Sequence, residues 1–216
     1  MNGRSPAVRD LAGRLRRSLR PSALERRVAA LRVARGDVAI DCGANVGNVT
    51  AALARRGALV HAFEPNPDAF AVLAERFGDT SNVELHRLAV LDRPGRVRLY
   101  LHVDAPADPV RASVGSSVLP FKANVDEERY VEVDAIDLSQ FVLGLAAPVK
   151  VVKIDVEGAE CPIVNRLIDT GAIERTETVL VELHDRHIPE LRRDYEALRE
   201  RLGREGLTDR VLTDWD

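Results

Sequence analysis

A pair of charged residues interrupts an apolar stretch of the sequence at VVKIDVEGAE, residues 151–160. The Val and Ile residues around them are typical of a strand buried in a sheet. Lys153 and Asp155 are two residues apart, so their side chains point to the same face of such a strand. An unpaired buried charge costs several kcal/mol. We therefore expect Asp155 to lie where the strand leaves the sheet, and Lys153 to neutralise Asp155 or Glu157.

A glycine turn, DCGANVG at residues 41–47, follows another apolar stretch. Gly43 and Gly47 allow a tight turn and a close approach of a ligand to the backbone, just before a helix begins. Asp41 would repel the pyrophosphate of a dinucleotide but attract the ammonium and sulfonium of S-adenosylmethionine. Glu64, after the next apolar stretch, is placed to accept hydrogen bonds from ribose hydroxyls. These residues favour S-adenosylmethionine over NAD.

The segments that must position these residues alternate between strand and helix. Repeated βα units of this kind predict an α/β fold, a mostly parallel sheet with helices on both faces. Ligands bind such sheets at the carboxyl ends of the strands. The expected strands are 37–42, 58–63, 83–90, 149–156, 178–183 and 209–213, and the expected helices are 49–56, 66–78, 158–168 and 188–202.

A long irregular stretch, residues 104–129, lies between two further expected strands at 96–103 and 130–136. Loops longer than ~15 residues in compact domains are often binding loops. We expect this insertion to determine acceptor specificity, with residues 114–118 facing the acceptor and Phe121 and Tyr130 packing on it.

The first 36 residues form an N-terminal extension, outside a catalytic domain at residues 37–216. They carry ten arginines against two acidic residues, although the whole chain has a net charge of −3. Ser5-Pro6 predicts the start of one amphipathic helix, and a capping box at Ser22 and Glu25 predicts a second, ending at Gly36. We interpret these helices as covering a domain edge or a dimer interface rather than as an arm that binds polyanions.

Composition narrows the class of protein further. Hydrophobic residues make up 45% of the chain, as in ordinary globular proteins. No apolar run approaches the ~18 residues that a membrane span needs, and no secretion signal is recognisable. Cys42 and Cys161 lack metal-type spacing, which predicts a cytoplasmic protein. Nucleic-acid methylation is disfavoured, because the catalytic portion is acidic and has no aromatic base-stacking motif after the fourth strand.

Five motifs together resemble the FkbM family of S-adenosylmethionine-dependent methyltransferases. They are DCGANVGN (41–48), FEPNP (63–67), VEVDAIDL (131–138), VKIDVEGAE (152–160) and VLVELH (179–184). The resemblance implies a class I methyltransferase (Rossmann-like) fold. It also implies methyl transfer, usually to a hydroxyl oxygen of a natural product or sugar. In the full fold the sheet is completed by a reversed hairpin pair of strands, whereas the last residues of this chain leave room for one strand.

The resemblance also implies roles for individual residues. Glu64 would hold the cofactor ribose, and Asp155 or one of its neighbours would face the transferred methyl group. The adenine would lie beside Leu88 and Ala89. The residues that would line the methionine half of the cofactor are Asp41, Gly43, Asn45 and Gly47.

An alcohol that accepts a methyl group must lose its proton, so a base near its oxygen helps the reaction. His184 has the most suitable unperturbed pKa, ~6.5. Glu182 shares a face of its strand with His184. The full set of candidates at the strand ends is Asp155, Lys153, Glu157, Glu182 and His184.

A divalent metal is a rival source of activation. Asp155 and Glu182 resemble, in their placement, the carboxylates that hold Mg²⁺ in catechol-type methyltransferases. A magnesium site needs several oxygen ligands, and Lys153 beside Asp155 would repel a cation. We therefore expect no metal.

Two other classes of function stay open: an NAD-type oxidoreductase, and a non-catalytic cofactor-binding or adaptor protein acting through the basic helices. For the methyltransferase, the expected acceptor is a small-molecule or carbohydrate hydroxyl. A homo-oligomer would form through the N-terminal helices or the C-terminal sheet edge.

Overall fold

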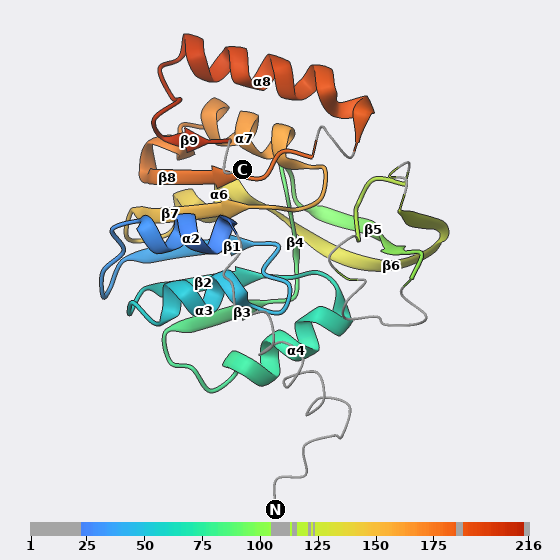
Figure 1. Cartoon of the computed structure of the whole chain (residues 1–216), viewed down its shortest axis with the longest axis horizontal. Helices are drawn as coiled ribbons and strands as arrows, with labels where there is room; N and C mark the ends of the chain where they lie inside the picture. The colour runs from blue at the N-terminus through green and yellow to red at the C-terminus, as the bar shows by residue number, and fades with distance from the viewer. Residues whose placement is uncertain are drawn as a thin grey trace, which may run out of the picture.

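A six-stranded sheet forms the centre of the protein (Figure 1). The computed structural model describes residues 23–104, 113, 116–120, 122, 124–184 and 188–213. Every pairing in this sheet is parallel, so the carboxyl ends of its strands lie along one edge. The strands lie in the order β3 (Val83–His86), β2 (Leu59–Phe63), β1 (Val38–Cys42), β7 (Val149–Ile154), β8 (Thr176–Val181) and β9 (Val211–Leu212). The predicted fold class is confirmed.

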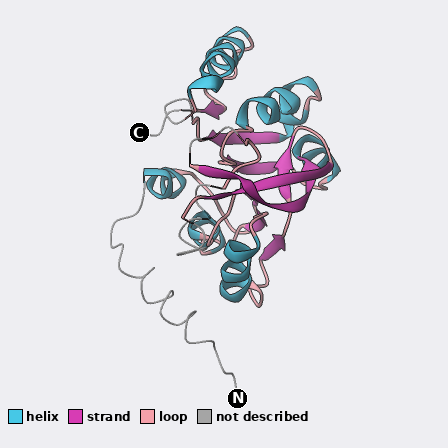
Figure 2. Ribbon diagram, turned by 90° about the vertical axis from the view of Figure 1, so that its right-hand side faces the viewer, coloured by secondary structure: helices cyan, strands magenta, loops and turns pink. Residues whose placement is uncertain are grey.

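Helices cover both faces of the sheet (Figure 2). Alternate residues of β1 point to opposite faces, so Ile40 and Cys42 belong to one apolar cluster and Ala39 to another. On the Ala39 face lie α2 (Ala23–Ala30), α3 (Asn48–Ala54) and α4 (Pro67–Phe77). On the Ile40 face lie α6 (Leu138–Gly144), α7 (Glu160–Asp169) and α8 (Arg192–Arg204). Two short 3₁₀ turns, η2 (Ala172–Arg175) and η3 (Pro189–Leu191), precede β8 and α8.

The predicted strand at 83–90 is wrong as a single strand, because the chain divides it between two sheets. After His86 the chain leaves the main sheet, and β4 (Ala89–Leu91) joins a three-stranded sheet. There it runs parallel to β6 (Val125–Asp137), which pairs antiparallel with β5 (Gly95–His102). Val90 is buried in the core on the α7 side, so the apolar run continues while its partner strand changes. A purely apolar pattern does not reveal this change of sheet.

Helix α6 was not predicted. Asp137 caps it, since its side chain accepts hydrogen bonds from the backbone N–H groups of Ser139 and Gln140. Arg166 of α7 contacts the same carboxylate at 3.1 Å. An Asp before such a short apolar stretch is a weak sequence signal, and the helix is stabilised mainly by its buried Leu138 and Val142.

Helix α2 packs on the domain through Val28, which is completely buried beside α3. It ends at Ala30, earlier than the predicted end at Gly36, which lies instead in a turn with a φ of +88°. The first predicted helix and Ser22 lie outside the described residues. The boundary between an extension and a catalytic domain at residue 36 stays a prediction.

The C-terminal strand β9 is short and pairs parallel with β8. The described part of the main sheet therefore has no reversed hairpin, and β9 and β3 are its two edges. No helix among the described residues is long and apolar enough to cross a bilayer. Assembly through the sheet edge stays a prediction.

Candidate active site

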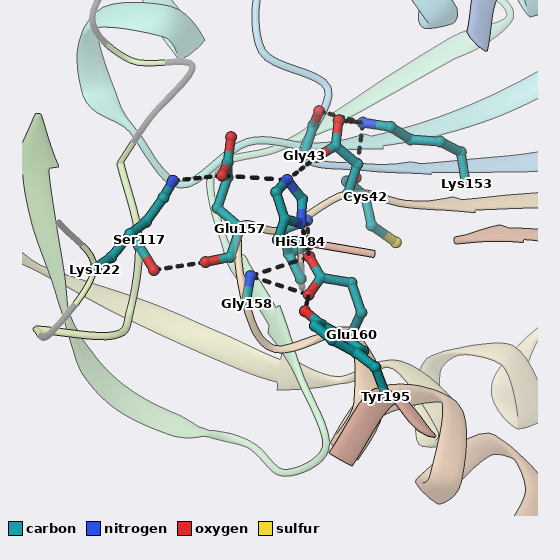
Figure 3. Close-up of polar contacts among 12 residues, drawn as sticks. Cys42, Gly43, Ser117, Lys122, Lys153, Glu157, Gly158, Glu160, His184 and Tyr195 are labelled. Atoms are coloured by element: carbon teal, nitrogen blue, oxygen red, sulfur yellow. Dashed lines mark hydrogen bonds and ion pairs between the residues drawn. The ribbon is translucent and has the colours of Figure 1, made fainter. Parts of the chain in front are cut away.

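Lys153 lies at the centre of a buried ion-pair group between the ends of β1 and β7 (Figure 3). Only 2% of the residue is exposed. Its Nζ donates hydrogen bonds to the carbonyl oxygens of Gly43 (2.7 Å) and Cys42 (3.1 Å). It also lies 3.1 Å from Oδ2 of Asp155 and 3.5 Å from Oδ1 of Asp41. The predicted pairing of Lys153 with Asp155 is therefore present, and Asp41 adds a second carboxylate.

The charge of Lys153 is fixed by these carboxylates. Burial alone would lower its pKa, but Asp155 and Asp41 together raise the pKa of Lys153 above its usual value. A lysine that holds its proton this firmly does not act as a base. Its place in this group supports a structural role that ties the glycine turn to the end of β7.

Asp41 is fully buried in the described structure. Its Oδ2 accepts a hydrogen bond from Oγ1 of Thr50 on α3, at 2.7 Å. Asp41 and Lys153 are directly opposite each other in the β1–β7 register. Asp41 is thus held by Thr50 and Lys153, and its predicted place beside the methionine half of the cofactor stays a prediction.

The glycine turn approaches the end of β7 so closely that side chains are excluded. A Cβ on Gly43 would lie 1.9 Å from the carbonyl oxygen of Asp155, and a Cβ on Gly47 would lie 2.4 Å from the ring of Phe77. Both glycines have positive φ values, +76° and +85°. Asn45 between them also has a positive φ, +49°. The turn is therefore a preformed cradle at the start of α3.

Glu64 lies beside this turn, at the end of β2. Its Oε2 accepts the backbone N–H of Asn45 and its Oε1 accepts that of Asn66, both at 2.8 Å. Burial raises the pKa of Glu64 to about 7, although these two hydrogen bonds oppose the shift. Each oxygen can still accept a second hydrogen bond. A ribose diol, which offers two O–H donors, fits this acceptor pair.

Leu88 and Ala89 follow β3, next to the end of β2. The backbone N–H of Glu64 donates to the carbonyl oxygen of His86 at 3.0 Å, which joins the two strand ends. Ala89 is buried and Leu88 is half-buried against the core. Their predicted place beside an adenine stays a prediction.

A second charged group surrounds His184, just after β8 (Figure 3). Its Nε2 lies 3.3 Å from Oε2 of Glu157 and 3.7 Å from Oδ1 of Asp155. Its Nδ1 lies 3.3 Å from Oε1 of Glu160. Burial alone would lower its pKa, but the three carboxylates, Glu160 first, raise the pKa of His184 to about 9. His184 is thus an imidazolium at neutral pH, which argues against its role as the base.

This imidazolium makes a pH-dependent contribution to stability. The folded pKa of about 9 exceeds the ordinary value of 6.5, so the contribution is complete below pH 6.5 and is lost as pH rises through 9. It amounts to roughly 3 kcal/mol by linkage. We expect the melting temperature of the wild-type chain to fall between pH 6.5 and 9, as measured by calorimetry.

His184→Gln should have a much flatter profile across the same interval. His102→Gln is a matched control, since among the described residues its ring pairs with Asp104, whose side chain is exposed. A wild-type melting temperature that stays constant from pH 6.5 to 9 would contradict the assignment.

Glu160 anchors the turn after β7. It is completely buried at the start of α7, where its Oε1 accepts the backbone N–H groups of Val156 and Gly158. Its Oε2 accepts the hydroxyl of Tyr195 on α8, at 2.9 Å. These bonds fix the backbone of the turn that carries Asp155 and Glu157, the two carboxylates on the Nε2 side of His184.

Glu157 occupies a strained position in the same turn, with a φ of +63°. Its carboxylate lies 2.5 Å from Nζ of Lys122, and its carbonyl oxygen accepts a hydrogen bond from Oγ of Ser117 at 2.6 Å (Figure 3). Lys122 and Ser117 belong to the long insertion. The insertion therefore contacts the turn directly, as its predicted role in acceptor specificity requires.

The insertion also contacts the segments that follow β1 and β2. The side-chain amide of Asn45 donates to Oγ of Ser113 at 3.0 Å, and that of Asn66 donates to Oγ of Ser116 at 3.2 Å. Val114, Gly115 and Phe121 lie outside the described residues.

Tyr130 lies on the small sheet, opposite Tyr100, which pairs in turn with Ser117 of the insertion. Its ring meets that of Tyr100 edge to face, and the guanidinium of Arg98 lies 4.4 Å from its centroid. Its expected packing on the acceptor stays a prediction.

Glu182 lies at the end of β8, half-buried, with its backbone N–H bonded to the carbonyl oxygen of Ile154. Burial and the neighbouring charge of Asp155 raise the pKa of Glu182 to about 7. A carboxylate near this value accepts protons well at neutral pH.

A metal is not needed to explain this charge arrangement. Asp155, Glu157 and His184 do bring potential ligand atoms within 4.8 Å of one another. However, Lys153 and Lys122 already neutralise the two carboxylates, and His184 holds a proton where a ligand needs a lone pair. The expectation of a metal-free reaction stays a prediction.

Sequence reasoning missed several members of the site: Thr50, Ser113, Lys122, Glu160 and Tyr195. Glu160 alone carried a signal, because it closes the motif that contains Lys153 and Asp155. Thr50 is on the helix after the glycine turn, Ser113 and Lys122 are in the insertion, and Tyr195 is on α8; none of the four stands in a motif that marks it.

A parallel sheet with a glycine turn after β1 and a carboxylate after β2 is the arrangement of Rossmann-like folds that bind a ribose-containing cofactor, S-adenosylmethionine in the methyltransferases among them. The methyltransferase FkbM domain model matches residues 41–210. The chain belongs to this family.

Sequence similarity to individual proteins covers a shorter part of the chain than the family model does. The ribosomal RNA small subunit methyltransferases A of Mycobacterium tuberculosis and Mycobacterium bovis are 39% identical to the chain over 70 residues. That match covers 32% of this chain and 22% of each relative's length.

Among solved structures, an rRNA methylase from Streptococcus thermophilus is 13% identical to the chain, with a TM-score of 0.44. The match covers 83% of this chain and 75% of the methylase. Precorrin-6y C5,15-methyltransferase from Geobacter metallireducens is 15% identical, with a TM-score of 0.44, over 84% of this chain and 69% of that chain.

Proposed function

We propose that the chain methylates a hydroxyl oxygen of a small natural product or a sugar, with Glu182 as the base. The observation that carries this proposal is the position of Glu182 beside Asp155 at the ends of β8 and β7, together with its pKa of about 7. Membership of the FkbM family supports methyl transfer. The same membership sets the NAD-type oxidoreductase aside.

Two parts of the chain would hold the cofactor. The Gly43–Gly47 turn, which has positive φ at both glycines, would lie against its methionine portion, and Glu64 would accept hydrogen bonds from its ribose hydroxyls. S-adenosylmethionine supplies an electrophilic methyl group. The lysine-centred group behind the turn keeps the cradle in one shape, which limits the entropy lost when donor and acceptor are aligned.

Glu182 would take the proton of the acceptor hydroxyl as the oxygen bonds to carbon. A base with a pKa near the working pH is ionised often enough to accept a proton and basic enough to hold it. His184 is unsuited to this task because it is already protonated. We assign it a positioning role: its imidazolium holds Asp155 and Glu157 together at the end of β7.

A transfer assay with S-adenosylmethionine labelled at the methyl group tests this function. The acceptor panel holds sugars and hydroxylated small molecules, the matching amines, and ribosomal RNA. We expect label only on hydroxylated compounds, as acid-stable methyl ethers. Label on RNA or on amines would overturn the proposed acceptor class, and cofactor binding without transfer to any compound would favour a non-catalytic protein.

Replacement of Glu64 tests the cofactor site. Glu64→Ala should weaken S-adenosylmethionine binding by roughly 10- to 100-fold, because hydrogen bonds to a charged group contribute about 1.5–3 kcal/mol. Isothermal titration calorimetry measures the dissociation constant, and circular dichroism verifies the fold. Glu75→Ala, at an exposed carboxylate of α4, is the matched control. Equal affinities for the two variants would contradict the placement of the ribose.

A further inference from the structure

A cluster of two imidazoles and a carboxylate lies outside the candidate active site, on β2 and β3. His61 is directly opposite Glu84 in the register of these strands, and His86 follows Glu84 on the same face. His61 and Phe63 are on the sheet face opposite to Ala62, which packs against α4. The cluster is thus embedded in the sheet surface beside α6, separate from the Asp41 and Lys153 group.

The three side chains bring their ligand atoms together at distances that suit a metal ion. Nδ1 of His61 lies 3.3 Å from Nε2 of His86 and 3.3 Å from Oε2 of Glu84. Nε2 of His86 lies 3.6 Å from Oε1 of Glu84. Ligands about 2.0–2.1 Å from a tetrahedral zinc ion are separated from one another by about 3.3–3.4 Å. The two ring nitrogens and the two Glu84 oxygens therefore lie at or near the separations of ligands around such an ion, with Oε2 beside His61 and Oε1 beside His86.

Aromatic side chains hold both imidazoles in place. The ring of His86 stacks on Phe63 at 4.3 Å between centroids, and Phe141 of α6 meets His61 edge to face at 5.1 Å. Because these aromatic contacts restrict the two imidazoles, less conformational entropy is lost when the ligands assemble around an ion. The contacts leave Glu84, whose side chain is 65% exposed, at the open side towards solvent. Water would have access to the fourth position.

A neutral imidazole offers one ring-nitrogen lone pair to a metal ion. Two imidazoles and one carboxylate suit Zn²⁺ and similar transition metals rather than Mg²⁺ or Ca²⁺, which prefer oxygen ligands.

We propose that His61, Glu84 and His86 form a binding site for one Zn²⁺-like divalent transition metal ion, distinct from the methyl-transfer site. The ion would join β2 to the edge strand β3. Since the carbonyl of His86 accepts the backbone N–H of Glu64, it would also brace the strand ends beside the cofactor cradle. This proposal does not depend on the identity of the methyl acceptor.

Cobalt binding tests the site. The chain, without a histidine tag, is stripped with EDTA, dialysed and titrated with Co²⁺ while visible absorption is recorded. We expect one Co²⁺ per chain, with the intense d–d bands of a tetrahedral site, displaced by Zn²⁺. A rise in melting temperature on adding Zn²⁺ is the second readout, because a ligand that binds only the folded state stabilises it.

Three variants locate the ion. His61→Ala and Glu84→Gln should each weaken Co²⁺ binding by roughly tenfold or more. Glu84 is exposed, so Glu84→Gln keeps the test valid even if a histidine variant fails to fold. His184→Gln should leave Co²⁺ binding unchanged. Absence of stoichiometric binding would overturn the proposal, as would binding that His184→Gln abolishes and Glu84→Gln retains, since that pattern places the ion in the candidate active site.

Discussion

Lys153→Met is expected to lower the free energy of unfolding by roughly 3–5 kcal/mol, the usual cost of removing one partner from a buried ion pair. The variant leaves Asp41 buried without a cation, and it removes the donor to the carbonyls of Cys42 and Gly43. Because the same donor shapes the glycine turn, S-adenosylmethionine affinity should fall as well. Urea unfolding measures the first effect and titration calorimetry the second.

The same strand offers a matched control for this variant. Lys150 of β7 pairs with Glu177 of β8 at the surface, and the Glu177 side chain is 62% exposed. Exposed pairs contribute about 0–1 kcal/mol, so Lys150→Met should have little effect. If Lys153→Met costs no more stability than Lys150→Met, the structural role of Lys153 is wrong. If it instead leaves stability intact and shifts the pH dependence of turnover, Lys153 is a base.

Glu182→Gln is expected to reduce the rate of methyl transfer by roughly 10²- to 10⁴-fold, the usual contribution of general acid–base catalysis. Glutamine keeps the size of the side chain and its capacity for hydrogen bonding but does not accept the proton. Affinity for S-adenosylmethionine should change little, since Glu182 lies after β8 and the cradle lies after β1 and β2. Single-turnover transfer of labelled methyl separates this rate from product release.

Glu177→Gln, on the same strand, controls for a general effect of removing a carboxylate. It should transfer methyl at the wild-type rate. A wild-type rate for Glu182→Gln would remove Glu182 as the base and leave Asp155 and Glu157 as the remaining carboxylate candidates.

The pairing of Lys153 with Asp155 was predictable because it follows from strand periodicity alone. Their spacing placed both on one face, and the cost of an unpaired buried charge made them partners. The second partner, Asp41, was not predictable from spacing. Its contact depends on the register of β1 against β7, which is set by the packing of the whole sheet.

His184 shows why a residue type does not determine a role. Its ordinary pKa made it the most suitable base in the sequence, but the structure surrounds it with carboxylates from the turn after β7 and from α7. Only the folded chain brings these charges together.

The division of residues 83–91 between two sheets was also not predictable from the sequence. Val90 would be apolar in either sheet, so the apolar pattern does not indicate which strand it pairs with.

The pH dependence of methyl transfer under saturating cofactor and acceptor tests the central claim most directly. If Glu182 is the base, the rate rises with pH along a limb centred near pH 7, because the ionised carboxylate is the active form. The same limb should be absent in Glu182→Gln and retained in His184→Gln. The account would be contradicted if the limb near pH 7 persisted in Glu182→Gln, or if it disappeared in His184→Gln.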